Sequence, residues 1–252
     1  MRRFLAALLL CFAGAVPAAA APVTINLSNV RTDAGIGNSL DIDDDPSTAY
    51  GTRTLTSALG GNSSTIHVDW QDTGSGALFD FDFSHVRTGE YVAQSSSSHA
   101  QFFTVVEDTS YSLSGQYSMT GSGNRISSQV ILLDQTMGNV IFREDSVSEY
   151  TANEIFTLGG INDGDQWSGP IEGRLTGTLL AGHSYQFSFG HSIFSMSQID
   201  AGATATGCVT LSIGGAPGGG NCGVAPVPLP AAAWLLLSGL AGLGIVGRRK
   251  AH

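Results

Sequence analysis

The chain has 252 residues and a formal net charge of −10. Between positions 21 and 226, six arginines stand against all 21 acidic residues, so this middle part carries a net charge of about −15. Such a charge repels nucleic acid and anionic lipid, which excludes nucleic acid as a partner. The middle part, about 210 residues long, fits one large all-β domain or two small ones.

The N-terminus has the features of a secretory signal peptide. Arg2 and Arg3 precede an apolar run over residues 4–15, and a run of alanines follows it. A basic start, an apolar run and a small-residue cleavage site in this order are typical of export signals that signal peptidase removes. We expect cleavage after Ala20. Cys11 lies inside the apolar run, and we expect it to leave with the signal rather than to carry a lipid.

The densest acidic cluster lies at residues 41–45, where four aspartates surround Ile42. Carboxylate oxygens suit Ca²⁺, but an EF-hand loop needs Gly at its sixth position and Glu at its twelfth. Pro46 and Thr52 stand at those positions. We therefore expect a solvated acidic turn and no cofactor, with a Ca²⁺ site of another kind left open.

Alternating apolar and polar residues predict half-buried strands through most of the middle part. The clearest rows lie at residues 66–70, 79–83, 111–119, 185–193 and 209–213. Residues 22–60 are less regular, with an early strand expected at 23–27, and residues 147–156 are the one stretch with a short helix as an alternative. Eight or more strands at this spacing predict an all-β, antiparallel β-sandwich of jelly-roll-like arrangement.

Two short connections predict antiparallel neighbours. Residues 134–139 separate two apolar runs and have the composition of a hairpin turn. Residues 179–184 are expected to link two further alternating strands in the same way. The last strand is expected to end near Ile213.

Candidate ligand-binding side chains are few in this chain. His183 and His191 share the parity of the aromatic residues in their strand, but about 26 Å separates them at about 3.3 Å per residue, so they cannot bind one metal ion. We expect structural or exposed roles for them and for His67, His85 and His99. Trp167 lies in a polar loop and is the best candidate to stack on a sugar ring.

The residues offer no clear catalytic motif. No Gly-x-Ser-x-Gly nucleophile elbow is present. Asp69, Asp72, Asp80 and Asp82 alternate on expected solvent faces. A glycoside hydrolase would need two such carboxylates at a defined separation, which the sequence does not give. Polar strand faces account for these residues equally well, and Trp70 is expected to point into the core.

Cys208 and Cys222 are the two cysteines that remain after export. In an exported chain two cysteines at this spacing predict one disulfide. A loop of this size would stabilise the fold by about 3 kcal/mol, and two cysteines are too few for a structural zinc site. Residues 214–226 between the last strand and the C-terminal segment have the Gly- and Pro-rich composition of a flexible linker.

The last 26 residues combine an extended motif, an apolar span and a basic end. The span from Leu229 to Gly247 would be roughly 28 Å long as a helix, close to the thickness of a hydrocarbon core of about 30 Å. The basic end predicts a cytoplasmic C-terminus. Pro228 and Pro230 favour an extended backbone just outside the membrane, which is a shape that a processing enzyme can bind.

This C-terminal segment resembles a PEP-CTERM protein-sorting signal in its VPLPA-CTERM form. The matching residues are the motif Val227, Pro228, Leu229, Pro230 and Ala231, the apolar run from Trp234, and the basic end Arg248, Arg249 and Lys250. Leu229 stands where the parent motif has Glu, and the resemblance covers about a tenth of the chain. The family implies recognition by an exosortase, a membrane-embedded, cysteine transpeptidase-like enzyme of Gram-negative bacteria, and association with exopolysaccharide or biofilm production.

Together these features predict an exported, non-enzymatic protein in four parts. The parts are a signal peptide (1–20), a β-sandwich ectodomain (21–213), a linker (214–226) and a sorting signal (227–252). We expect the protein to be anchored in the inner membrane before processing and retained afterwards at the cell surface or in the extracellular matrix of a Gram-negative bacterium. The ectodomain would be structural or adhesive, with binding of exopolysaccharide left open. The alternatives are a secreted polysaccharide-active hydrolase and an unprocessed, membrane-anchored binding protein.

Overall fold

The computed structural model describes residues 22–89, 92–121, 124–150, 154–158, 172–195 and 202–215, and all regular structure within these ranges is β-strand. The strands are β1 (Val23–Ile36), β2 (Ser39–Ser47), β3 (Gly51–Leu59), β4 (Asn62–Asp72), β5 (Ala77–Arg87), β6 (Ala93–Val105), β7 (Thr109–Gly121), β8 (Asn124–Asp134), β9 (Asn139–Tyr150), β10 (Glu154–Thr157), β11 (Glu172–Gly173), β12 (Thr176–Leu179), β13 (Ser184–Ser195) and β14 (Ala203–Ile213).

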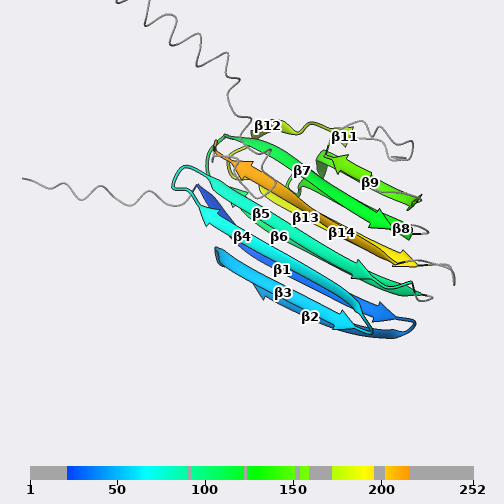
Figure 1. Cartoon of the computed structure of the whole chain (residues 1–252). Helices are drawn as coiled ribbons and strands as arrows, with labels where there is room; N and C mark the ends of the chain where they lie inside the picture. Colours follow the sequence, from blue (N-terminus) through cyan, green and yellow to red (C-terminus); the bar gives the residue numbers. More distant parts are fainter. Residues whose placement is uncertain are drawn as a thin grey trace, which may run out of the picture.

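The strands form two antiparallel sheets, which confirms the prediction of an antiparallel β-sandwich. Sheet A has the order β11-β9-β8-β13-β6-β1-β2, and sheet B has the order β10-β7-β14-β5-β4-β3, with β12 also pairing with β7. The strands of both sheets run along one common direction (Figure 1). We call the end where β1 begins and β14 ends the proximal end, and the opposite end the distal end.

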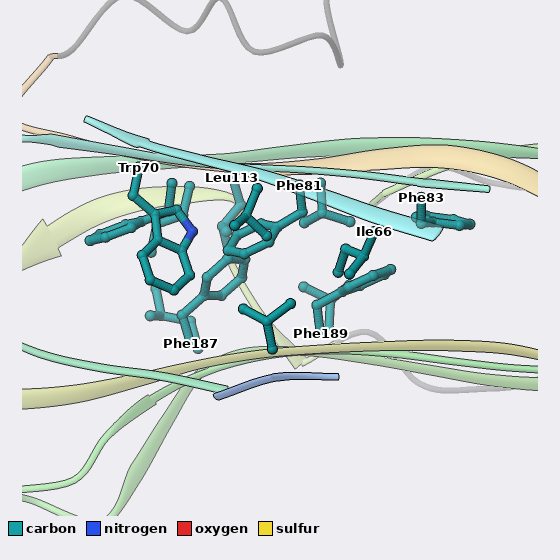
Figure 2. Packing of buried hydrophobic residues seen from close by; sticks show 14 of the residues in the cluster. Ile66, Trp70, Phe81, Phe83, Leu113, Phe187 and Phe189 are labelled. Carbon is teal, nitrogen blue, oxygen red and sulfur yellow. The ribbon is translucent and has the colours of Figure 1, made fainter. Parts of the chain in front are cut away.

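The predicted alternation places the apolar rows between the two sheets. Phe79, Phe81 and Phe83 of β5 are buried, as are Phe187 and Phe189 of β13. Figure 2 shows the rings of the two sheets pointing toward one another across the interior. Trp70 is 1% exposed, as its parity in β4 predicts. Burial of these rings removes the largest apolar areas from water and is the main source of stability of such a sandwich.

Of the two connections that were predicted to join antiparallel neighbours, one forms a hairpin and the other does not. Residues 134–139 do form a hairpin, because β8 and β9 pair from Asp134 and Asn139 onward. Residues 179–184 do not, since β12 pairs with β7 in sheet B whereas β13 pairs with β6 and β8 in sheet A. This connection therefore crosses from one sheet to the other.

The alternative prediction of a short helix over residues 147–156 was wrong. β9 extends to Tyr150 in register with β8, and residues 154–157 form β10 against β7. β9 gains backbone hydrogen bonds from the antiparallel strand β8, and β10 gains them from β7, which is more than 30 residues away in the sequence. Such tertiary pairing outweighs the weak local preference of a short segment for helix.

The acidic residues 41–45 lie in the edge strand β2 and not in a turn, so this expectation was also wrong. The Asp43 carboxylate accepts a hydrogen bond from the Thr56 N–H at 3.1 Å, and the Asp41 carboxylate accepts one from the Ala58 N–H at 2.7 Å. Asp45 pairs with Arg53 at 3.0 Å. These aspartates thus face β3, the edge strand of the other sheet. Among the described residues no group of three or more His, Cys, Asp or Glu side chains could hold a metal ion.

The interior changes from apolar to polar along the strands. Trp70, Phe79, Phe103 and Tyr185 fill the proximal half. The distal half contains buried polar side chains from five strands: Thr32, Ser57, Ser64, His85, Arg87, Ser95 and Ser97. Buried polar groups of this kind must find partners inside the protein, and several do, since the Ser57 hydroxyl donates to the Thr32 carbonyl at 3.0 Å and the Ser95 hydroxyl donates to the Val86 carbonyl at 2.5 Å.

Candidate functional site

Most residues predicted to carry function lie outside the described residues. These are Trp167, Cys222, the motif at 227–231 and the basic residues 248–250. The described ranges contain no helix that is long and apolar enough to cross a membrane. Of the predicted site residues, the structure describes Cys208.

Cys208 lies in the middle of β14 with its side chain on the outer face of sheet B. It is 6% exposed and forms a disulfide. Its pairing with Cys222 stays a prediction, because Cys222 is outside the described residues. On either side of Cys208 in the sheet lie Asp82 of β5 and Gln116 of β7.

A polar depression surrounds Cys208 on this outer face. Its lining residues are Asp82, Gln116, Tyr117, Ser118, Thr206, Gly207 and Cys208. Ser118 and Thr206 are cross-strand partners whose hydroxyl oxygens lie 3.2 Å apart. The depression has a volume of about 360 Å³, which falls within the range of small-molecule sites. Hydroxyl, amide and carboxylate groups are all present, so the depression can both donate and accept hydrogen bonds.

The four aspartates expected on solvent faces do not form a catalytic pair at this depression. Asp69 and Asp80 lie directly opposite each other on β4 and β5. However, Asp80 is 7% exposed and accepts a hydrogen bond from Thr210 at 2.5 Å, and Asp69 accepts one from Gln71 at 2.7 Å. Only Asp82 of the four lines the depression. The depression therefore contains one of these four carboxylates, whereas glycoside hydrolysis uses two that flank one bound sugar bond.

Three histidines are buried among the aromatic rings of the interior, and two of them contact each other, which the alternation pattern did not predict. The rings of His85 and His191 stack at 5.1 Å with an angle of 5° between their planes. His99 stacks on Phe81 at 4.2 Å. Within the described residues, the rings of His85 and His191 make one polar contact, which joins His85 Nε2 to the Ser97 hydroxyl at 3.4 Å.

Burial keeps these three histidines neutral. Loss of hydration lowers the pKa of His85 to about 3. Burial likewise lowers the pKa of His99 to about 3, opposed by a hydrogen bond with Gln101 and assisted by the charge of Arg53. The pKa of His191 falls well below its ordinary value because of burial, with a further contribution from His85. Rings held neutral without strong hydrogen bonds act as aromatic core residues at neutral pH.

His183 lies at the proximal end and not in the core. Its Nδ1 is 2.7 Å from a carboxylate oxygen of Asp134, and the backbone N–H groups of Thr136 and Met137 donate to the other oxygen. Burial alone would raise the pKa of Asp134, but the hydrogen bond with His183 and those with the backbone outweigh it and hold the pKa below its usual value. This pair fastens the β8–β9 turn to the residue that precedes β13.

The chain matches no family model, and no curated protein matches it. Among solved structures it is similar to the infectious bursal disease virus Gx strain structure, with 12% identity, a TM-score of 0.27, and coverage of 77% of this chain and 58% of that one. A second match is the enzymatically active domain of tailspike protein 4 of bacteriophage CBA120, with 9% identity, a TM-score of 0.22, and coverage of 73% of this chain and 19% of that one. The chain thus spans less than two thirds of either structure, and similarities this low say nothing of activity.

Proposed function

We propose that this chain is an exported protein that an exosortase recognises and processes at its C-terminus, and that is then retained at the cell surface or in the exopolysaccharide matrix. The observation that carries the proposal is the order of residues 227–252: an extended Val-Pro-Leu-Pro-Ala motif, an apolar span and a basic end. The N-terminal signal features support it, since export must precede processing. An acidic β-sandwich that precedes a Gly-rich linker is compatible with a domain carried on the outer side of the membrane.

In this proposal the precursor is held in the inner membrane by one helix over residues 229–247. The basic residues 248–250 keep its C-terminus in the cytoplasm, so the motif and the ectodomain lie on the outer side. Pro228 and Pro230 keep the motif extended for the enzyme. After processing, the ectodomain acts as a structural or adhesive component of the matrix and has no catalytic role.

Replacement of both motif prolines tests the sorting proposal. We expect Pro228→Ala/Pro230→Ala to remain at its unprocessed mass in a Gram-negative host that expresses an exosortase, because the motif loses its fixed extended backbone. The wild type should lose the tail that contains Lys250 in that host and keep it in a host without the enzyme. Pro226→Ala is the matched control, since Pro226 lies just outside the motif, and it should be processed as the wild type is. Intact mass spectrometry of the recovered protein measures all four outcomes, and a complete tail on the wild type in the exosortase host would contradict the proposal.

We further propose that the depression around Cys208 is where the ectodomain binds a neutral, hydroxyl-rich sugar. Its amide and hydroxyl groups suit sugar hydroxyls. Ser118→Ala/Thr206→Ala should weaken binding to a glycan array by roughly tenfold or more, because each hydrogen bond contributes about 0.5–1.5 kcal/mol. Thr120→Ala/Thr204→Ala removes the neighbouring hydroxyl pair, at 2.6 Å, which does not line the depression, and should bind as the wild type does. Absence of binding to any glycan, with and without Ca²⁺, would leave only the structural role.

A further inference from the structure

Three turns lie side by side at the proximal end and are fastened to one another. The Gly182 N–H donates to the Val105 carbonyl at 2.8 Å, and the Ala181 N–H donates to the Asp108 carboxylate at 2.8 Å. The Gln135 N–H donates to the Ser184 carbonyl at 2.8 Å. The β12–β13 connection therefore sits between the β6–β7 turn and the β8–β9 turn. The three turns form one continuous surface.

Each of these turns carries an exposed apolar side chain. Val106 is 54% exposed, Leu180 is 47% exposed and Met137 is 61% exposed. Single exposed apolar residues are ordinary on a protein surface, but these three lie on turns that hydrogen bonds join to one another, so they share one end of the sandwich. No two of the three are on the same turn, so the fold and not the local sequence brings them together.

Both ends of the described domain lie at this same surface. The Val106 N–H donates to the Pro22 carbonyl at 3.1 Å, and the Gly214 N–H donates to the Ser110 carbonyl at 2.8 Å. The chain therefore enters and leaves the sandwich beside the β6–β7 turn. Thirteen residues separate Gly215 from the apolar span that begins at Leu229. A Gly-rich chain of this length has a typical end-to-end distance of roughly 20 Å.

The disulfide of Cys208 shortens this tether further. With the predicted Cys208–Cys222 pairing, seven Cα–Cα steps lead from Cys222 to Leu229 at the start of the span, and they reach about 24 Å when fully extended. Cys208 itself is five residues from the end of β14 at Ile213, which is about 17 Å along a strand. The distance from Cys208 to the proximal end takes up about 17 Å of this reach, so only a short length of chain is left between the domain and the span.

We infer that, while the chain is anchored, the proximal end of the sandwich rests on the bilayer surface, with Val106, Met137 and Leu180 in contact with the lipid headgroup region. This inference rests on the proposed function, because it needs the C-terminal span to be in the membrane. The distal end then points away from the membrane. The sorting motif is held between the domain and the bilayer, where a membrane-embedded enzyme acts.

The charges around this surface make the contact depend on the tether. Glu107 is exposed beside Val106 and repels anionic lipid, and Asp108 is occupied by the Ala181 N–H. A free ectodomain would therefore bind vesicles poorly. A short tether supplies a local concentration in the millimolar range, which is enough to populate a weak apolar contact.

The test uses the whole chain after removal of its signal peptide, inserted in vesicles of phosphatidylethanolamine and phosphatidylglycerol without exosortase. A fluorescent label is attached to Gln135→Cys, on the same turn as Met137, or to Asn38→Cys, on the exposed β1–β2 turn at the distal end. Nitroxide on the lipid headgroups quenches a label that lies close to the bilayer. We expect quenching at position 135 to be several-fold stronger than at position 38, and equal quenching at both would overturn the inference.

Two variants separate apolar contact from tethering alone. Val106→Ser/Met137→Ser/Leu180→Ser should reduce quenching at position 135, whereas Leu40→Ser/Ile42→Ser, which changes exposed apolar residues of β2, should not. Unchanged quenching in the triple variant would show that the apolar side chains do not contact lipid and would overturn the inference. Extraction of the wild type from vesicles by carbonate would instead contradict membrane anchoring, and with it the proposed function.

Discussion

Acidification is expected to unfold the sandwich steeply between pH 6.5 and pH 3. The pKa values of His85, His99 and His191 lie far below the value of about 6.5 that histidine has in an unfolded chain. Below pH 6.5 the unfolded state therefore binds up to three more protons than the folded state. Each such proton lowers the free energy of unfolding by about 1.4 kcal/mol per pH unit, or about 4 kcal/mol per pH unit for the three. A domain of ordinary stability, about 5–15 kcal/mol, would lose it within a few pH units.

Urea unfolding of the protein at pH 7, 6 and 5 measures this dependence. Above pH 6.5 the three histidines are neutral in both states, so their contribution should not change with pH there. His99→Phe keeps an aromatic ring next to Phe81 and should reduce the slope by about one third, since one of three protons is no longer taken up. His67→Gln, on the outer face of sheet B, should keep the slope of the wild type. A free energy of unfolding equal at pH 7 and pH 5 would contradict the prediction.

Phe81→Ala should lower the free energy of unfolding by about 3–5 kcal/mol. Phe81 is fully buried and lies at the centre of an aromatic group, with ring centroids 4.2 Å from His99, 5.7 Å from Phe187 and 6.2 Å from Trp70. These neighbours come from both sheets. The sheets cannot close on the space that Phe81 leaves, because each is fixed by its backbone pairing. The cost therefore combines lost apolar burial with a cavity.

Phe102→Ala is the matched control for this substitution. Phe102 lies three residues before the end of β6, on the outer face of sheet A, where it is half-buried. Its replacement should cost about 1 kcal/mol, as expected for a residue away from the core. Denaturant unfolding at neutral pH gives both values, and similar losses for the two variants would mean that the interior is not packed around Phe81.

The inward rows of this sandwich could be predicted from the sequence because a strand alternates its faces with a period of two. His85 has the same parity as Phe79, Phe81 and Phe83, so the alternation could also have predicted that His85 is buried. Its stacking on His191 was not, because the contact depends on β5 of one sheet lying opposite β13 of the other. Strand order of this kind is set by long-range pairing, which alternation does not encode.

The depression around Cys208 could not be predicted for the same reason. Its polar lining side chains, Asp82, Gln116, Ser118 and Thr206, come from β5, β7 and β14, and each is an ordinary polar residue on the outer face of its own strand. The acidic segment 41–45 shows the opposite failure. Its composition resembles that of a turn, yet it forms a strand because it pairs with β1. Its carboxylates also accept hydrogen bonds from N–H groups of β3.

The contacts of Asp41 and Asp43 with β3 limit how the protein can associate. β3 is the edge strand of sheet B, and the N–H groups of Thr56 and Ala58 on that edge are already bonded to carboxylates. An edge with free N–H groups can template the addition of a foreign strand, which is a common route to aggregation. A foreign strand would have to displace these two carboxylates before its own carbonyl groups could accept from the Thr56 and Ala58 N–H groups. This part of β3 is therefore protected against the addition of a strand from another copy.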